Sequence, residues 1–255
     1  MSGITNNPYL ETSRDDLLRI MTAPNAGAHN AIYRGKYLGT SVTAAQYAAI
    51  AAGTFDDLYI GDYWTMGGVN YRLGAFDYWL NCGDTACTDH HILIVPDTCL
   101  YNAAMNSTNT TAGGYMSTQI NVSGLVQAVS IIENAFGTSH LMPRRNYLTT
   151  KVTNGVASSG AWFYDKVTIM CEQMVYGSGI FSPASDGSNT PTNYRVEKSQ
   201  LPLFQHEPSR ICNRNNWWLR DVIDASSFAD VGNDGNAAYN YASSSLGVRP
   251  YFCIK

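Results

Sequence analysis

Large apolar residues alternate with small polar ones along the C-terminal part of this chain, and this pattern constrains its fold most. Trp218, Leu219 and Val222 stand close together, Phe228 and Val231 follow, and residues 248–254 form a second apolar run. Side chains of these types anchor short β-strands. We therefore expect a buried β-framework near the C-terminus that carries a polar surface.

Two arginines lie within this apolar pattern, Arg220 and Arg249. A guanidinium group among apolar neighbours needs partners for its fixed fork of donors. We expect each arginine to form a fixed ion pair or to donate to backbone carbonyl groups.

The polar residues between the apolar anchors form a candidate binding surface. Short amides and hydroxyls make adaptable hydrogen bonds, and rigid aromatic rings give contact area at a low cost in conformational entropy. An ordinary solvated loop surface is the alternative interpretation of the same composition. The candidate ligand-binding residues are Asn213, Asn215, Asn216, Trp217, Ser226, Ser227, Asn233, Asn236, Tyr239, Asn240, Tyr241 and Ser243.

The composition excludes several classes of protein. Of the 255 residues, 45% are hydrophobic and only 14% charged, which is typical of a chain that buries a full core. The net charge is -4 and no basic run occurs, so we expect no nucleic-acid partner. No stretch approaches the ~20 apolar residues of a membrane-spanning helix. The first residues show no secretory signal, so we expect synthesis in the cytoplasm and no membrane insertion.

Helix signals come early in the chain and strand signals come late. Residues 1–40 are expected to form an arm with one short helix at 12–21, which docks onto another protein or a second copy. Residues 41–255 are expected to form one domain. Its helices are predicted at 42–53, where Thr43 and Gln46 make a capping box and Gly53 ends the helix, and at 123–136.

The strand signals favour an α+β protein. Strands are predicted at 58–60, 63–64, 69–73, 92–95, 167–171 and 248–254, with a hairpin turn at 66–68 and a polar loop at 182–193. Asp97 is expected to cap a helix after the fourth of these strands. After residue 138 the chain is expected to form only loops and short strands. This order differs from the βαβ alternation of a parallel sheet.

Metal and disulfide chemistry have only weak support in the sequence. Cys82, Cys87, His90 and Cys99 could supply four zinc ligands, but their spacing matches no common zinc knuckle. Residues 207–209 and 233–236 offer oxygen ligands for calcium, although turns of this composition more often satisfy their own backbone. The six cysteines are expected to be free, with zinc or pairing of Cys82 and Cys87 left open. We expect no cofactor.

Catalytic motifs are not evident in the sequence. It contains no Gly-x-Ser-x-Gly elbow, no His-Glu-x-x-His pair and no glycine-rich phosphate loop, and its glutamates are scattered singly. We expect a protein that is not an enzyme.

The C-terminal pattern also resembles a known group of proteins. Trp-Leu-Arg-Asp-Val at 218–222, Phe-Ala-x-Val at 228–231 and Gly-Val-Arg-Pro-x-Phe at 247–252 are similar to the ending of C-type-lectin-like domains in phage and gut-bacterial proteins, including variable proteins diversified by retroelements. Residues 53–64, 90–97 and 167–177 also resemble phage structural proteins of that kind.

This resemblance implies a C-type-lectin-like fold with short twisted strands, two or three helices and long loops. It implies a protein on the virion surface, on a tail fibre, head fibre or capsid, that binds a host cell-surface protein or glycan. Other virion proteins and further copies of the chain are the implied partners. The residues that fit the asparagine-rich variable positions of diversified relatives are Asn213, Asn215, Asn216, Ser226, Ser227, Asn233, Asn236, Asn240 and Ser243. Calcium-dependent sugar-binding lectins differ, because this chain lacks a clear Glu-Pro-Asn motif.

Two other functions stay open from the sequence alone. A capsid or tail decoration protein would cement neighbouring subunits without recognising a host. An enzyme related to the formylglycine-generating group would share the lectin-like fold and would need an active cysteine pair or a metal among residues such as Cys82, Cys87 and Cys212.

Overall fold

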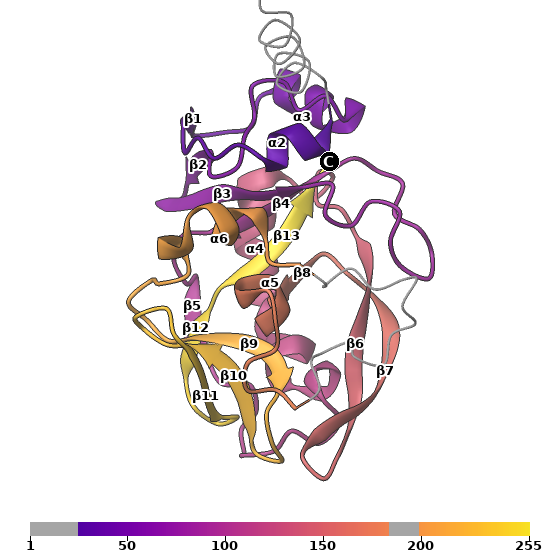
Figure 1. The fold of residues 1–255 in the computed structure, drawn as a ribbon, viewed down its shortest axis with the longest axis vertical. Helices are drawn as coiled ribbons and strands as arrows, with labels where there is room; N and C mark the ends of the chain where they lie inside the picture. The colour runs from indigo at the N-terminus through magenta and orange to yellow at the C-terminus, as the bar shows by residue number, and fades with distance from the viewer. Residues whose placement is uncertain (1–24, 184–198) are drawn as a thin grey trace, which may run out of the picture.

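A computed structural model describes residues 25–183 and 199–255 of the chain (Figure 1). Its strands form a six-stranded sheet, a five-stranded sheet and a two-stranded sheet, and its helices are short. The chain therefore has the α+β architecture that the order of signals predicted. Within the described residues, no helix has the length and apolar character needed to cross a membrane.

Each of the two larger sheets contains strands from the first and the second half of the chain. The helices, including short 3-10 and π segments, are α2 (Ala26–Asn30), α3 (Ala44–Ala52), η1 (Tyr115–Ser117), η2 (Ile120–Gly124), α4 (Leu125–Phe136), α5 (Glu172–Tyr176), α6 (Pro202–His206) and η4 (Pro208–Arg210). The strands of the six-stranded sheet, in spatial order, are β1 (Tyr37–Gly39), β2 (Tyr63–Met66), β3 (Val69–Phe76), β4 (Ile92–Pro96), β13 (Pro250–Ile254) and β8 (Val167–Ile169). Those of the five-stranded sheet are β11 (Ala237–Tyr241), β10 (Ser227–Val231), β9 (Trp217–Val222), β12 (Leu246–Val248) and β5 (Tyr101–Ala103), and β6 (Arg144–Thr153) pairs with β7 (Val156–Asp165).

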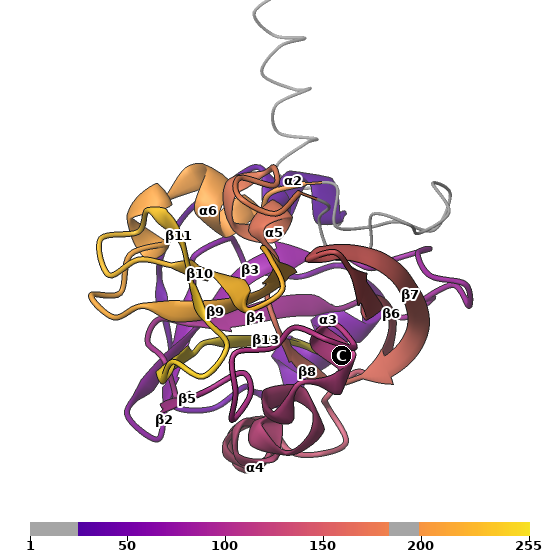
Figure 2. The same cartoon turned by 90° about the horizontal axis from the view of Figure 1, so that it is seen from below.

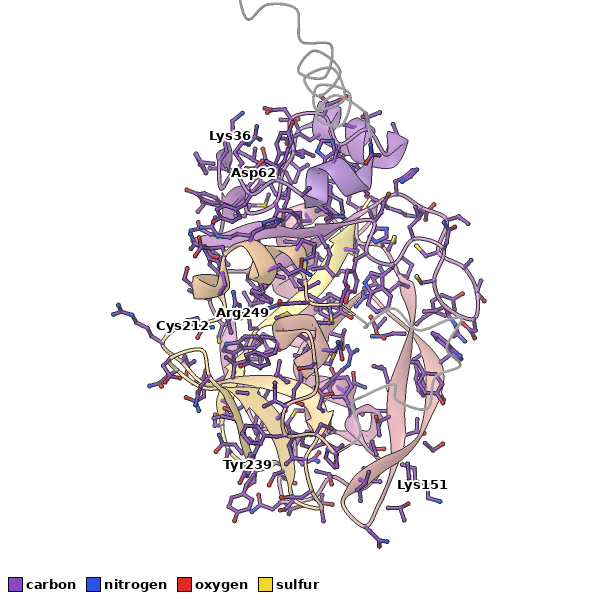
Figure 3. The ribbon with its side chains drawn as sticks, in the orientation of Figure 1. Lys36, Asp62, Lys151, Cys212, Tyr239 and Arg249 are labelled. Atoms are coloured by element: carbon purple, nitrogen blue, oxygen red, sulfur yellow. The ribbon has the colours of Figure 1, made fainter. Side chains whose placement is uncertain are left out.

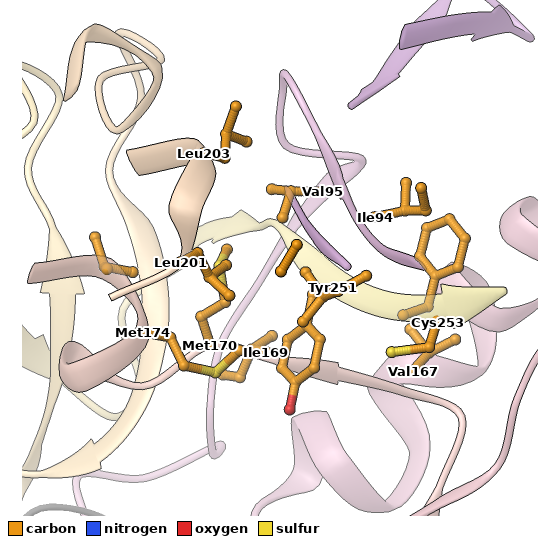
Figure 4. Close-up of a cluster of buried hydrophobic side chains, with 14 of the residues drawn as sticks. Ile94, Val95, Val167, Ile169, Met170, Met174, Leu201, Leu203, Tyr251 and Cys253 are labelled. Atoms are coloured by element: carbon orange, nitrogen blue, oxygen red, sulfur yellow. The ribbon is translucent and has the colours of Figure 1, made fainter. Parts of the chain in front are cut away.

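The C-terminal strand β13 lies inside the six-stranded sheet. It pairs antiparallel with β4 on one side and with β8 on the other. All five residues of β13 and all five of β4 are buried, as expected for strands that are covered on both faces. Figure 4 shows side chains of β4, β8 and β13, among them Ile94, Ile169 and Tyr251, packed into one apolar cluster with Met174 and Leu201.

Helix α4 packs on this sheet through a single face. The Phe136 ring lies 5.2 Å from the Tyr71 ring and 5.0 Å from the Phe252 ring, measured between centroids. Ile132 on the same face is fully buried, whereas Val126 is 66% exposed. The prediction of an amphipathic helix at 123–136 is therefore confirmed, except that its first residues belong to the π-helical segment η2.

Several local predictions are confirmed because neighbouring residues alone determine them. Thr43 and Gln46 form both hydrogen bonds of the capping box on α3, and Gly53 adopts the left-handed conformation with φ 69°. Gly67 and Gly68 have positive φ in the tight turn between β2 and β3, as a two-residue hairpin requires.

The structure differs from the sequence prediction at the N-terminal boundary. Asn25 caps helix α2, and β1 pairs with β2 in the six-stranded sheet. Residues 26–39 thus belong to the folded domain, so its boundary lies before residue 40. The helix expected at 12–21 and residues 184–193 of the polar loop lie outside the described residues.

Three other predictions are wrong. Asp97 caps no helix; its carboxylate instead accepts a hydrogen bond from Arg72 Nε at 2.6 Å, and strand β5 follows. Residues 58–60 form only one isolated bridge, between Ile60 and Tyr33. After residue 138 the chain is not limited to short strands, because β6 and β7 have ten residues each. The partners of Asp97 and Ile60 are distant in sequence, so no local pattern reveals them, whereas the Asn154-Gly155 turn that joins β6 to β7 is a local hairpin signal that the sequence analysis missed.

We predict that the contact of Phe136 with the sheet dominates the stability of α4. Phe136→Ala should lower the free energy of unfolding by about 3–5 kcal/mol, because it leaves a cavity between helix and sheet. Val126→Ala, on the exposed face of the same helix, should change it by less than about 0.5 kcal/mol. Urea unfolding of the two variants measures both effects, and equal losses would contradict the assigned face.

Candidate functional site

The candidate site lies on the five-stranded sheet. Two buried tryptophans, Trp217 and Trp218, anchor the central strand β9 of this sheet. All six residues of β9 are buried. Trp217 Nε1 donates to the carbonyl oxygen of Ile211 at 3.3 Å, and Trp218 Nε1 donates to that of Ala103 at 2.8 Å. Because the two rings point to opposite faces of the strand, β9 is tied to neighbours on both sides.

Arg249 fastens the two sheets where the chain passes from β12 into β13. Its Nε donates to the carbonyl of Pro96 at the end of β4, at 2.8 Å, and its Nη1 donates to the carbonyl of Ile211 at 3.3 Å. The guanidinium carbon lies 5.0 Å from the centroid of the Trp217 ring. Figure 3 places Arg249 in the interior between the sheets. Burial lowers the pKa of Arg249 to about 10, so the group stays charged at neutral pH.

The prediction of carbonyl contacts for the two arginines is confirmed. Arg220 is fully buried and its Nη1 donates to the carbonyl of Ile169 at 3.1 Å. Together the two arginines link backbone atoms of β4 and β8 to the sheet that carries the candidate surface. The surface thus stands on a rigid base.

A buried carboxylate connects three segments of the five-stranded sheet. Asp230 on β10 accepts a hydrogen bond from Asn216 Nδ2 at 3.1 Å and another from Asn240 Nδ2 at 3.1 Å. Burial raises the pKa of Asp230, while the two amide donors act in the opposite direction. Two candidate ligand residues, Asn216 and Asn240, therefore stabilise the sheet from inside.

Two candidate residues do not reach the surface. Trp217 is fully buried under Arg249, and Ser227 is 3% exposed because β10 lies between β9 and β11. The prediction that the Trp217 ring supplies contact area for a partner is therefore wrong. Tryptophan fits both roles, and only the packing around β9 distinguishes them.

Four further candidates are half-buried and hydrogen-bonded to the protein itself. Asn213 Nδ2 donates to Cys99 Sγ at 3.2 Å, and Asn215 Nδ2 donates to Asn102 Oδ1 at 3.2 Å. Ser226 Oγ donates to Asp224 Oδ1 at 2.9 Å. With Asn240 on Asp230, these side chains offer at most part of their surface to a partner.

The exposed candidates follow strand β11 from one end to the other. Tyr239 and Tyr241 lie on the same face of the strand and are 52% and 60% exposed. Asn233 and Asn236 are exposed at the turn before β11, and Ser243 is exposed after it. Figure 3 shows Tyr239 at the outer margin of the molecule. The structure therefore brings these five residues to one edge of the sheet.

Two apolar residues that sequence reasoning missed lie beside this edge. Phe181 is 45% exposed and its ring lies 5.4 Å from that of Tyr239, edge to face. Ile180, its neighbour in the chain, is 49% exposed. We call Ile180, Phe181, Tyr239 and Tyr241 the aromatic patch. Exposed groups of large apolar residues are unusual and mark interaction sites.

A buried glutamate holds the first half of the aromatic patch in place. The carboxylate of Glu172 accepts hydrogen bonds from the backbone N–H groups of Ile180, Phe181 and Ser182 at 2.9, 3.1 and 3.2 Å. Ser182 Oγ donates to the carbonyl of Val222 on β9 at 2.9 Å. Glu172 and Phe181 are only nine residues apart in the chain, but no sequence motif marks their contact, and the tertiary fold then brings Phe181 to Tyr239 on β11.

The four residues considered as zinc ligands do not come together. Within the described residues, no group of three or more histidine, cysteine, aspartate or glutamate side chains could hold a metal ion. His90 Nδ1 lies 2.7 Å from Asp77 Oδ2, Cys87 Sγ contacts Met142 Sδ at 3.8 Å, and Cys99 contacts Asn213. All six cysteines, each within the described part of the chain, are free.

The turns considered for calcium satisfy their own backbone. Asn236 N–H donates to Asp234 Oδ1 at 3.1 Å, and Gly232 N–H donates to the Asn236 carbonyl at 2.8 Å. Glu207 accepts a hydrogen bond from the Ser209 hydroxyl. These contacts match the alternative of ordinary Asx and Ser turns.

Comparison with known proteins places the candidate site within one matched region. Residues 150–255 match the family described as Domain of unknown function (DUF6273). This range contains β9 to β12 and the aromatic patch. No curated protein matches the chain, and no solved structure matches it either.

We predict that Arg249 is essential for the junction of the sheets. Arg249→Leu removes the side-chain donor to the Pro96 carbonyl and one of the two donors to the Ile211 carbonyl, and it removes the cation over the Trp217 ring, so the free energy of unfolding should fall by about 3–5 kcal/mol. Arg214→Leu, at an exposed position, should change it by less than about 0.5 kcal/mol. Urea unfolding followed by tryptophan fluorescence measures both, and a mild effect of Arg249→Leu would contradict its role.

We predict that loss of the amide donor of Asn216 destabilises the protein in a pH-dependent way. Asn216→Ala should cost about 1–3 kcal/mol at a pH above the raised pKa of Asp230, where the carboxylate is ionised. The raised pKa means that the folded protein holds this proton to a higher pH than the unfolded chain. As the pH falls through the raised pKa, the carboxyl becomes neutral and the cost should shrink.

The comparison of Asn216→Ala with the parent protein uses urea unfolding over a pH series, because only the direction of the change of cost with pH is predicted. Asn215→Ala is the matched control, because its amide donates to the neutral Asn102 and its cost should not depend on pH. A pH-independent cost of Asn216→Ala would show that Asp230 is not the charge involved.

Proposed function

We propose that this chain is a recognition protein that binds a partner molecule through the aromatic patch and the exposed amides and hydroxyl beside it. The observation that carries this proposal is the exposure of Tyr239 and Tyr241 on one face of an edge strand, next to Phe181. Asn233, Asn236 and Ser243 extend the same surface at either end of β11. We call these seven residues the recognition surface.

The physical case rests on rigid aromatic groups above a buried frame. A tyrosine loses little conformational entropy on binding because only two side-chain torsions are fixed, and its ring and hydroxyl give both apolar contact and a hydrogen bond. β11 is held by Asp230 through Asn240, and the segment of Phe181 is held by Glu172. The surface is therefore largely formed before a partner arrives, which lowers the cost of binding.

A C-type-lectin-like fold is the finer description that we propose for this architecture. It is favoured by the C-terminal sequence pattern and by three features of the chain: the C-terminal strand β13 between β4 and β8 in one sheet, a second sheet formed by β5 and β9 to β12, and two helices, α3 and α4, beside the first sheet. Figure 2 shows α4 and the curved β6–β7 hairpin flanking that sheet.

The resemblance to phage proteins supplies the biological setting of the proposal. It implies display on a virion and a host cell-surface protein or glycan as the partner, with other virion proteins attached elsewhere on the chain. Single recognition surfaces of this kind bind weakly, and many copies on one particle would raise the overall affinity. The mechanism is binding at equilibrium, with no chemical step.

We predict that binding to cells depends on the two exposed tyrosines. The probe is a panel of intact bacterial cells, each also presented after protease treatment and after periodate oxidation of its glycans. Tyr239→Ala with Tyr241→Ala should weaken binding to a positive strain by about 100-fold, because truncation of two central aromatic anchors costs about 1–2 kcal/mol each.

Tyr164→Ala is the matched control, since Tyr164 is 65% exposed on β7 and belongs to no part of the recognition surface. Loss of binding after protease treatment would identify a protein partner, and loss after periodate a glycan. Undiminished binding of the folded double variant would rule out this surface. Failure of the parent protein to bind any strain, with labelling between subunits of intact particles, would favour the cement function.

A further inference from the structure

Strand β11 has a free edge. It is the outermost strand of the five-stranded sheet and pairs only with β10 among the described strands. The register pairs Ala242 N–H with the Ser226 carbonyl and Gly232 N–H with the Asn236 carbonyl. In an antiparallel pair every second residue bonds inward, so residues 238 and 240 point their backbone groups to β10. The backbone groups of Ala237, Tyr239 and Tyr241 therefore point outward.

These outward groups are almost entirely unused. Within residues 25–183 and 199–255, the N–H groups of Ala237, Tyr239 and Tyr241 make no hydrogen bond, and the Tyr241 carbonyl accepts one from Ser244 N–H in the following turn at 2.8 Å. An exposed row of donors and acceptors of this kind is a template for another strand.

The other sheet edges among the described residues are protected in ways that β11 is not. Strands β1, β5 and β8 have only three residues each, and the register of β6 with β7 is interrupted twice. Short strands and bulges discourage pairing with another chain. β11 has five residues in unbroken register with β10, and its sequence Ala-Ala-Tyr-Asn-Tyr contains no charge and no proline.

We propose that β11 pairs with β11 of a second copy of this chain, antiparallel, about a two-fold axis at Tyr239. The outward residues are symmetric about Tyr239, so each finds a complementary mate. Tyr239 N–H meets the carbonyl of the partner's Tyr239, and the groups of Ala237 meet those of the partner's Tyr241. A two-fold interface requires such self-complementarity. The two five-stranded sheets become one continuous sheet.

This dimer extends the proposed function without depending on it. Edge pairing uses backbone groups in the plane of the sheet and leaves the faces of the sheet open. The side chains of Tyr239 and Tyr241 lie on one face in both copies, so the two aromatic patches join into one surface across the axis. A partner that carries the same binding group more than once would contact the recognition surfaces of both copies, which raises its apparent affinity.

The first test separates the outward N–H of Tyr239 from its side chain. Tyr239→Pro removes the phenol and, from the backbone, only an N–H donor that points away from β10, a position that tolerates proline in edge strands. Tyr239→Val is the matched control, because it removes the phenol and keeps the N–H. The measurement is molar mass by light scattering and sedimentation over a dilution series of each full-length variant, with far-ultraviolet circular dichroism as the check of folding.

We expect a dimer for the parent chain and for Tyr239→Val, and a dissociation constant about 10- to 100-fold higher for Tyr239→Pro, since the symmetry removes two hydrogen bonds at once. A parent chain that is monomeric at every concentration would overturn the proposal. A dimer that Tyr239→Pro does not weaken would overturn it as well, because its interface would lie elsewhere.

The second test uses the position of the axis. Tyr239→Lys and Tyr239→Glu each place like charges directly opposite each other in a homodimer and should weaken it about tenfold. An equimolar mixture should restore a dimer, because lysine then faces glutamate across the axis. No recovery in the mixture would refute an axis at Tyr239. Both tests read mass, not binding to cells, so their failure is distinguishable from failure of the recognition surface.

Discussion

The rest of the structure depends on the fixed passage of the chain from one sheet into the other at Arg249. β12 belongs to the sheet of the recognition surface and β13 to the six-stranded sheet, and only Arg249 lies between them. Its guanidinium group bonds the carbonyls of Pro96 and Ile211 and lies over Trp217. A buried charge is stable only when its donors are engaged, so these contacts stabilise the junction between the two sheets.

The recognition surface contains fewer residues than the sequence analysis predicted, because many of the polar candidate residues stabilise the sheet instead. Asn216 and Asn240 donate to the buried Asp230, and Asn213 and Asn215 contact groups beside β5 and β12. A protein that must present rigid aromatic rings also needs a rigid strand beneath them. Asparagine can therefore either stabilise the sheet or contact a partner, and the burial of each asparagine decides which of these roles it has.

Local signals were reliable where a few neighbouring residues determine the backbone. The capping box of Thr43 and Gln46 and the glycine turn between β2 and β3 formed as predicted. Prediction failed where a distant partner decides the outcome. Asp97 is of a residue type that caps helices, yet Arg72 and Arg210 compensate its charge, and Phe181 packs against Tyr239 of β11, far along the chain. No spacing in the sequence encodes these contacts.

The sequence by itself determined the α+β class, the buried frame around Trp218, Leu219 and Val222, and the presence of amides and phenols near the C-terminus, because hydrophobicity and turn chemistry are local properties. The tertiary structure alone decided that Trp217 is buried, that Phe181 joins Tyr239, and that the backbone of β11 is open on one side. The physical reason is that burial and strand order depend on contacts between residues far apart in the chain, and a pattern in one segment does not specify what covers it.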